Sequence, residues 1–184
     1  MARLFVAIDL PEHIKQQLLE VRNGSTLPAA RWVDADQFHL TLHFIGETPA
    51  AKMADYKGVL GSIKQEAFDL QFSGIGQFPP DGEGPARVLW VGVANSPALR
   101  ELYAATGYAL KTHGFQVDGQ RYHPHITLAR FKQSPRRGWL SKYIDQWIHY
   151  TSEPFQVDSF ALYSSDRRHS GSVYTQEAVY PLKK

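Results

Sequence analysis

Cysteine is absent from this sequence of 184 residues. Without thiols the chain forms no disulfide framework, holds no metal through thiolates and has no thiol nucleophile. Its chemistry must therefore use other side chains. The hydrophobic content of 43% is enough for a single domain with a sizeable core, and nothing in the composition indicates disorder.

Long apolar runs are also missing. The first ten residues, MARLFVAIDL, contain too short an apolar stretch for a secretory signal, and an aspartate interrupts it. No later segment approaches the length of a membrane span. We therefore expect a cytoplasmic protein that does not associate with membranes.

A large excess of charge of one sign is the third absence. Twenty basic residues face eighteen acidic ones, which gives a formal net charge of +2. This balance excludes the strongly basic proteins that coat nucleic acid without specificity, so any such contact must be local. Two clusters qualify, Arg136-Arg137 and Arg167-Arg168-His169, and for each of them phosphate contact and solvated loop charge are equally good interpretations.

What the sequence does contain is one short motif in two copies, HLTL and HITL, whose histidines His39 and His125 are 86 positions apart. Each copy lies in an apolar run typical of a β-strand. Successive side chains of a strand point to opposite faces, so His39 and Thr41 share one face, as do His125 and Thr127. Two strands of this kind indicate the two halves of one cleft.

The motif belongs to a longer repeat of strand, helix, histidine strand, helix and strand. Around the first motif we expect a buried strand at 4–8, helices at 12–21 and 50–66, and a strand at 68–72. Around the second we expect a buried strand at 88–93, helices at 96–112 and 135–150, and a strand at 155–163. Ser96-Pro97 is typical of a helix start, with serine as the cap and proline at the first position.

This self-similarity predicts a duplicated α+β unit with pseudo-twofold symmetry. The copies cover roughly residues 1–80 and 85–165 within a single domain that spans 1–184. Residues 79–85 (PPDGEGP) indicate an exposed loop rather than a linker, and a strand at 173–179 completes one sheet.

These segments resemble those of a known family. The matching parts are RLFVAI at 3–8, FHLTL at 38–42 with FIGE at 44–47, RVLW at 87–90 and HPHITLAR at 123–130. They resemble the two-histidine (2H) phosphoesterase superfamily and, within it, the bacterial RNA 2',3'-cyclic phosphodiesterases, also called LigT-like proteins or 2'-5' RNA ligases. The similarity spans nearly the whole chain in the expected order.

The resemblance implies a bilobal fold in which two mainly antiparallel sheets flank a central cleft, with helices on the outside. It implies an enzyme that opens the 2',3'-cyclic phosphate at an RNA 3' end to a 2'-phosphate, together with reversible joining of RNA ends through a 2'-5' linkage. No metal or nucleotide cofactor is expected. By the same resemblance His39 is the general acid, His125 is the general base and Arg130 binds phosphate.

The residue types support this chemistry independently. Opening a cyclic phosphodiester requires a base for the attacking water and an acid for the departing ribose oxygen, and imidazoles with a pKa of about 6.5 serve as either. Thr41 and Thr127 are placed to hydrogen-bond the non-bridging phosphate oxygens. The near symmetry of the motifs leaves the order of acid and base open when only the residues are considered.

Three further residues share the motif segments. His43 and His123 have the strand parity of His39 and His125, so four histidines are available for a metal site, although no acidic residue lies on either motif face. We interpret His43 and His123 as cleft-wall residues that support the catalytic pair. Simple alternation puts Arg130 on the opposite face, unless a bulge turns it toward the cleft.

Aromatic residues offer stacking surfaces for the bases of a single-stranded RNA end. Five aromatic residues are candidates, and Trp32, beside Arg31 and just before the first motif, is the first choice among them. The candidates are Phe5, Trp32, Phe44, Trp90 and Tyr163.

Hypotheses from different classes follow. The first is a metal-independent phosphodiesterase that acts on RNA 2',3'-cyclic phosphate ends, tRNA fragments among them, or on a small cyclic nucleotide. The alternative is a non-catalytic protein that binds RNA ends or nucleotides, and a metal-dependent phosphodiesterase is a third. The intact histidines and threonines favour the enzyme, and because one chain completes its own cleft we expect a monomer.

Overall fold

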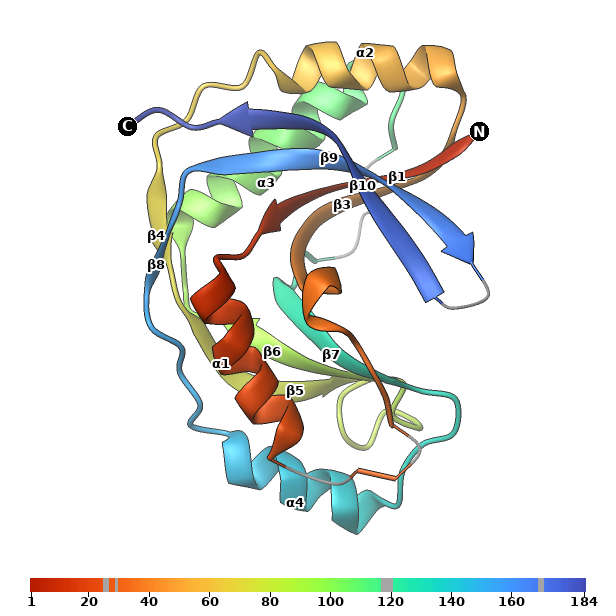
Figure 1. Ribbon diagram of the computed structural model, residues 1–184, viewed down its shortest axis with the longest axis vertical. Coiled ribbons are helices and arrows are strands. Elements are labelled where there is room, and N and C mark those ends of the chain that lie inside the picture. Colours follow the sequence, from red (N-terminus) through yellow and green to blue (C-terminus); the bar gives the residue numbers. More distant parts are fainter. Residues whose placement is uncertain (25–26, 29, 117–120, 169–170) are drawn as a thin grey trace.

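The computed structural model describes residues 1–24, 27–28, 30–116, 121–168 and 171–184. This part of the chain forms an α+β fold built on two four-stranded sheets, in which all neighbouring strands are antiparallel, and a small third sheet (Figure 1). The predicted fold class is confirmed.

The first sheet carries the first histidine motif. Its strands, in spatial order, are β10 (Gly171–Pro181), β9 (Ser159–Arg168), β1 (Ala2–Asp9) and β3 (His39–Thr48). The second sheet carries the second motif. Its strands are β2 (Ala30–Trp32), β7 (His125–Phe131), β6 (Val88–Val93) and β5 (Phe72–Phe78). The third sheet pairs β4 (Phe68–Leu70) with β8 (Phe155–Val157).

Each four-stranded sheet contains strands from both halves of the sequence. β5 of the first half pairs with β6 of the second half, and β9 of the second half pairs with β1 of the first. The predicted strand at 155–163 is divided at Asp158 for this reason, because its first part pairs with β4 and its second part with β1.

The helices lie on the outside of the sheets. They are α1 (Glu12–Asn23), α2 (Ala50–Leu60), α3 (Pro97–Lys111), α4 (Arg137–Trp147) and the short 3₁₀ helix η1 (Ala35–Gln37). In Figure 1, α2 and α3 lie against the first sheet, and α1 and α4 lie against the second. None of the described helices is long and apolar enough to cross a membrane.

The predicted ends of two helices can be compared with the structure. The Ser96 hydroxyl accepts a hydrogen bond from the Leu99 N–H at 3.2 Å, so the predicted cap of α3 is confirmed. The helix expected at 50–66 ends earlier, at Leu60, with Gly61 as its C-cap. The residues that follow run beside the C-terminal segment instead, where the Ala67 N–H donates to the Lys183 carbonyl.

Both histidine strands contain a bulge at the same point of the motif. In β3 the pairing with β1 skips Leu42, and in β7 the pairing with β6 skips Leu128. A bulge places one extra residue in the strand and reverses the alternation of side chains beyond it. The side chains directly after each motif, His43 and Phe44 in β3 and Ala129 and Arg130 in β7, therefore lie on the faces opposite to those that simple alternation predicts.

Both faces of the first sheet carry buried apolar residues. One face belongs to the main core, and the other holds a smaller cluster of Phe5, Ala7, Ala161 and Tyr163, against which Tyr174 of β10 packs. Because His39 and Thr41 lie on this second face, we call it the histidine face of the first sheet. The corresponding face of β6 and β7, with His125 and Thr127, is the histidine face of the second sheet.

The first prediction concerns Gly76 of β5, whose missing side chain leaves room for the Trp90 indole next to the second motif. A Cβ atom at Gly76 would lie 2.3 Å from two carbons of the Trp90 indole. We expect Gly76→Ala to lower the free energy of unfolding by about 1–3 kcal/mol, because the rigid indole must shift. The matched control is Gly58→Ala in α2, where nothing lies within 4 Å of the new methyl group, and there we expect a gain of about 0.5–1 kcal/mol. Urea unfolding measures both, and equal effects would contradict the packing analysis.

Candidate active site

His39, the first residue of β3, is enclosed by aromatic rings. Its ring centroid lies 4.8 Å from that of Tyr163, 5.5 Å from that of Tyr174 and 6.3 Å from that of Phe5, each in an edge-on arrangement. The His39 side chain is only 7% exposed. Tyr174 reaches this position from β10, so the edge of the sheet helps to cover the imidazole.

Acidic groups surround His39 and oppose the effect of its burial. Burial is the largest influence on the pKa of His39 and lowers it, and Lys15 lowers it as well. The Gln37 carbonyl and the carboxylates of Asp9 and Asp36 raise it. The net result is a pKa below the ordinary value. Asp9 Oδ1 lies 3.8 Å from His39 Nε2 and 2.9 Å from Lys15 Nζ. Among the described residues, His39 Nδ1 is buried without a hydrogen bond of good geometry.

The imidazole of His125, the first residue of β7, is fixed by a hydrogen bond of good geometry to the backbone, unlike that of His39. Its Nδ1 lies 2.8 Å from the His123 carbonyl oxygen. Because a carbonyl only accepts, Nδ1 carries the proton of the neutral ring and Nε2 is left as the free basic nitrogen. The ring of Phe78 lies edge-on at 5.0 Å, and that of Trp90 lies at 6.4 Å.

No carboxylate of the described part of the chain is among the groups that act on the pKa of His125. Burial lowers its pKa, the His123 carbonyl raises it, and the charges of His123 and Arg130 lower it further. The two motifs therefore differ in electrostatic environment although their backbones are alike. Carboxylates favour a proton on His39, and positive charge disfavours one on His125.

The two motifs lie on neighbouring strands of different sheets. β3 and β7 contact each other, and next to the second motif the Val33 N–H donates to the Leu128 carbonyl at 2.9 Å. Thr41 and Thr127 are half-buried on the same faces as the histidines that precede them. The structure thus places four of the predicted site residues on two strands that contact each other.

Arg130 lies on the histidine face of the second sheet. Leu128 and Ala129 are both fully buried because of the bulge, so the exposed Arg130 returns to the side of His125 and Thr127. The effect of its charge on the pKa of His125 agrees with this position. The bulge that the sequence analysis required is therefore present.

The interpretation of His43 as a cleft-wall residue is wrong. The bulge at Leu42 turns His43 to the opposite face, where it is 5% exposed and its Nε2 donates to the Tyr103 carbonyl at 2.9 Å. His123 stays near His125, with their ring centroids 6.3 Å apart. Within the described ranges, no three His, Asp or Glu side chains are grouped so as to hold a metal ion.

The bulge at Leu42 also changes which aromatic residue faces the site. Phe44 returns to the histidine face, where it is 71% exposed and its ring lies 6.2 Å from that of Phe5. Trp32, the first choice from sequence, packs instead against Tyr143 of α4 at 6.2 Å. The bulge is what places Phe44 on the face of His39, and it cannot be read from the sequence. For this reason the sequence alone favours Trp32 over Phe44 as the stacking residue.

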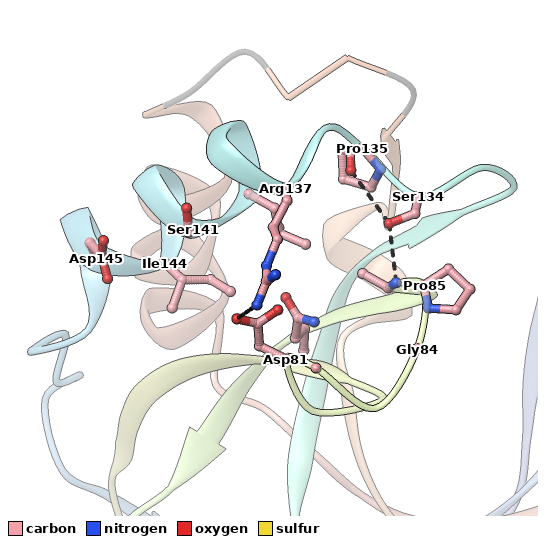
Figure 2. Close-up of a pocket in the computed structure, with 13 residues that line it drawn as sticks. Asp81, Gly84, Pro85, Ser134, Pro135, Arg137, Ser141, Ile144 and Asp145 are labelled. Carbon is pink, nitrogen blue, oxygen red and sulfur yellow. Dashed lines mark hydrogen bonds and ion pairs between the residues drawn. The ribbon is translucent and has the colours of Figure 1, made fainter.

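The two basic clusters lie apart from the histidines. A cavity of about 450 Å³ lies between α4 and the β5–β6 loop, and Arg137 pairs there with Asp81 at 3.1 Å (Figure 2). Arg167 lines a separate groove of about 260 Å³ together with Arg3, Glu47 and Asp166. His169 of the second cluster lies outside the described residues.

Comparison with known proteins gives a consistent result. Residues 10–169 match the 2'-5' RNA ligase superfamily. An RNA 2',3'-cyclic phosphodiesterase of Thermotoga maritima is 32% identical over 94% of this chain and 91% of its own length, and one of Escherichia coli is 37% identical over 70% and 71%. The crystal structure of E. coli LigT complexed with 3'-AMP superposes with a TM-score of 0.79 at 30% identity, covering 100% of this chain and 99% of LigT.

Asp9 provides the second prediction. Asp9→Asn removes a carboxylate that favours the protonated form of His39, so we expect the pKa of His39 to fall further below its ordinary value. Titration of the imidazole protons by NMR measures this shift. His125 serves as the internal control, because Asp9 is not among the charges that act on it. An unchanged or higher midpoint for His39 would contradict the proposed electrostatic environment, and Asp145→Asn on the far side of the second sheet should move neither histidine.

Proposed function

The chain belongs to the 2'-5' RNA ligase superfamily, and on that premise we propose that it hydrolyses 2',3'-cyclic phosphate ends of RNA to 2'-phosphate ends. The observation that supports this best is the pair of histidines on neighbouring strands, with the carboxylates of Asp9 and Asp36 acting on His39 and the charge of Arg130 acting on His125. This arrangement suits a reaction that takes up one proton and releases another.

We propose the following reaction. Nε2 of His125 accepts a proton from water, and the water oxygen forms a bond to phosphorus. The bond between phosphorus and the ribose 3' oxygen breaks, and that oxygen takes a proton from His39. The products are a 2'-phosphate and a free 3'-hydroxyl, and a second proton exchange with solvent restores both histidines. When a 5'-hydroxyl replaces water as the nucleophile, His125 takes its proton, the bond between phosphorus and the 3' oxygen breaks in the same way, and the product is a 2'-5' linkage with a free 3'-hydroxyl.

The electrostatic environment supports this assignment of acid and base. A general acid must begin protonated. Burial lowers the pKa of His39 below its ordinary value, and the carboxylates of Asp9 and Asp36 oppose that shift, whereas no carboxylate among the described residues does so at His125. A general base must begin neutral with a free nitrogen. At His125, Arg130 disfavours the charged form and the His123 carbonyl leaves Nε2 free.

Three further side chains complete the proposed phosphate site. The hydroxyls of Thr41 and Thr127 donate to the non-bridging oxygens, one from each sheet, and Arg130 balances their negative charge. Phe44 offers an exposed ring on the same face as His39, and we propose that it stacks on the base next to the cyclic phosphate.

We propose that the whole chain acts as one domain, a duplicated unit in which residues 1–80 and 85–165 each contribute one motif. The exchange of strands between the two main sheets supports this view, because neither half builds its sheet alone. We further propose a cytoplasmic monomer that needs no cofactor and acts on cleaved RNA such as tRNA fragments.

The direct test uses a short RNA that ends in a 2',3'-cyclic phosphate, with EDTA present throughout. We expect turnover to a 2'-phosphate end, and a decrease in kcat of at least about a hundredfold for His39→Ala and for His125→Ala, since each loses one proton transfer. His149→Ala, an exposed histidine after α4, is the matched control and should be fully active. Binding of the RNA without turnover would favour the non-catalytic alternative, and activity that EDTA abolishes would favour the metal-dependent one.

Phe44 is tested separately. Phe44→Leu keeps an apolar side chain but removes the ring, so we expect KM for the RNA to rise by about 5-fold to 100-fold while kcat stays within about threefold. The control is Tyr108→Leu in α3, an aromatic residue that is equally exposed, at 73%, but lies on a helix and on neither histidine strand. If both replacements change KM alike, Phe44 does not contact the base.

A further inference from the structure

Three aromatic rings form a column behind the first histidine strand. The ring of Tyr103 in α3 lies between the other two, stacked 4.4 Å from His43 at an interplanar angle of 20° and 3.9 Å from Tyr122 at 6°. His43 comes from β3, and Tyr122 comes from the segment that leads into β7. The column therefore connects the two histidine strands through a helix.

Both ends of the column are fixed by hydrogen bonds to the backbone. His43 Nε2 donates to the Tyr103 carbonyl at 2.9 Å, and the Tyr122 hydroxyl donates to the Thr41 carbonyl at 3.2 Å. Burial lowers the pKa of His43, and burial together with Tyr103 raises the pKa of Tyr122. Both groups therefore keep the neutral, donating form at neutral pH.

The hydroxyl of Tyr122 joins the two motifs directly. Its acceptor, Thr41, belongs to the first motif and lies two residues beyond His39. The residue after Tyr122 is His123, whose carbonyl holds Nδ1 of His125. One side chain thus connects the backbone of the first motif to the residue that orients the second catalytic histidine.

We propose that Tyr122 is a positioning residue that fixes the separation and relative orientation of His39 and His125. The inference builds on the proposed function, in which the two imidazoles act on opposite sides of one phosphorus atom. Such paired proton transfers depend steeply on geometry, and a misplacement of about 1 Å costs on the order of a hundredfold in rate. Phosphate binding is less demanding, because several donors share it.

The proposal is tested by removing first the hydroxyl and then the ring. Tyr122→Phe loses only the hydrogen bond to Thr41, and we expect kcat to fall about 3-fold to 10-fold. Tyr122→Leu also loses the stack on Tyr103, and we expect a fall of about 30-fold to 100-fold. In both variants KM for the cyclic-phosphate RNA should stay within about threefold, and the pH dependence of kcat/KM should not move, because neither catalytic group is altered.

Tyr143 provides the matched control. Its buried hydroxyl donates to the Val21 carbonyl at 2.8 Å, which is the same kind of hydrogen bond, but between α4 and α1. Tyr143→Phe and Tyr143→Leu should lower thermal stability as the Tyr122 variants do and leave kcat unchanged below the melting temperature.

Two results would overturn the role of Tyr122. In one, Tyr122→Phe loses no more kcat than Tyr143→Phe, and this comparison holds even if Tyr122→Leu fails to fold. In the other, the Tyr122 variants change KM and leave kcat intact. Failure of the proposed function is a different observation, since the unmodified protein would then not turn over, or would do so without either histidine.

Discussion

In each histidine strand the last residue of the motif, Leu42 or Leu128, has no partner in the neighbouring strand, and the placement of the groups around the site depends on that bulge. Before the bulge, imidazole and hydroxyl share one face. After it two consecutive side chains are buried, and the next returns to the histidine face. Phe44 and Arg130 reach the site only for this reason. A regular strand would bury Phe44 or Arg130 in the core, or force a register shift that turns the whole motif over.

The two motifs show how nearly equal backbones support unequal chemistry. β1 contributes Asp9 opposite His39, whereas β6 contributes Gly92 opposite His125. The carboxylate raises the pKa of the first imidazole against its burial, and Arg130 adds to the effect of burial on the second. Burial lowers the pKa of both rings, and the strongest charges that act on them differ in sign.

The sequence was sufficient for the fold class, the histidine strands and the cap of α3, because each rests on local periodicity or on a local hydrogen bond such as that of Ser96. The remaining features depend on which strands pair across long sequence separations, and these pairings cannot be read from a local pattern. The division of the strand at Asp158 depends on two different partner strands, and the burial of His43 depends on a bulge that only the pairing with β1 reveals. The packing of Trp32 against Tyr143 could not be predicted for the same reason, since this contact joins segments more than a hundred positions apart.

Hydrophobic packing explains why each sheet forms, but it does not by itself fix one sheet against the other. Burial of apolar surface is nearly non-directional, so two lobes that share a core retain freedom to slide. A buried hydroxyl is different, because leaving it unpaired costs free energy and only one placement satisfies it. The bond from Tyr122 to Thr41 crosses between the histidine strands, as does the stack on Tyr103. Directional contacts of this kind convert two stable sheets into one site with a defined distance between its imidazoles.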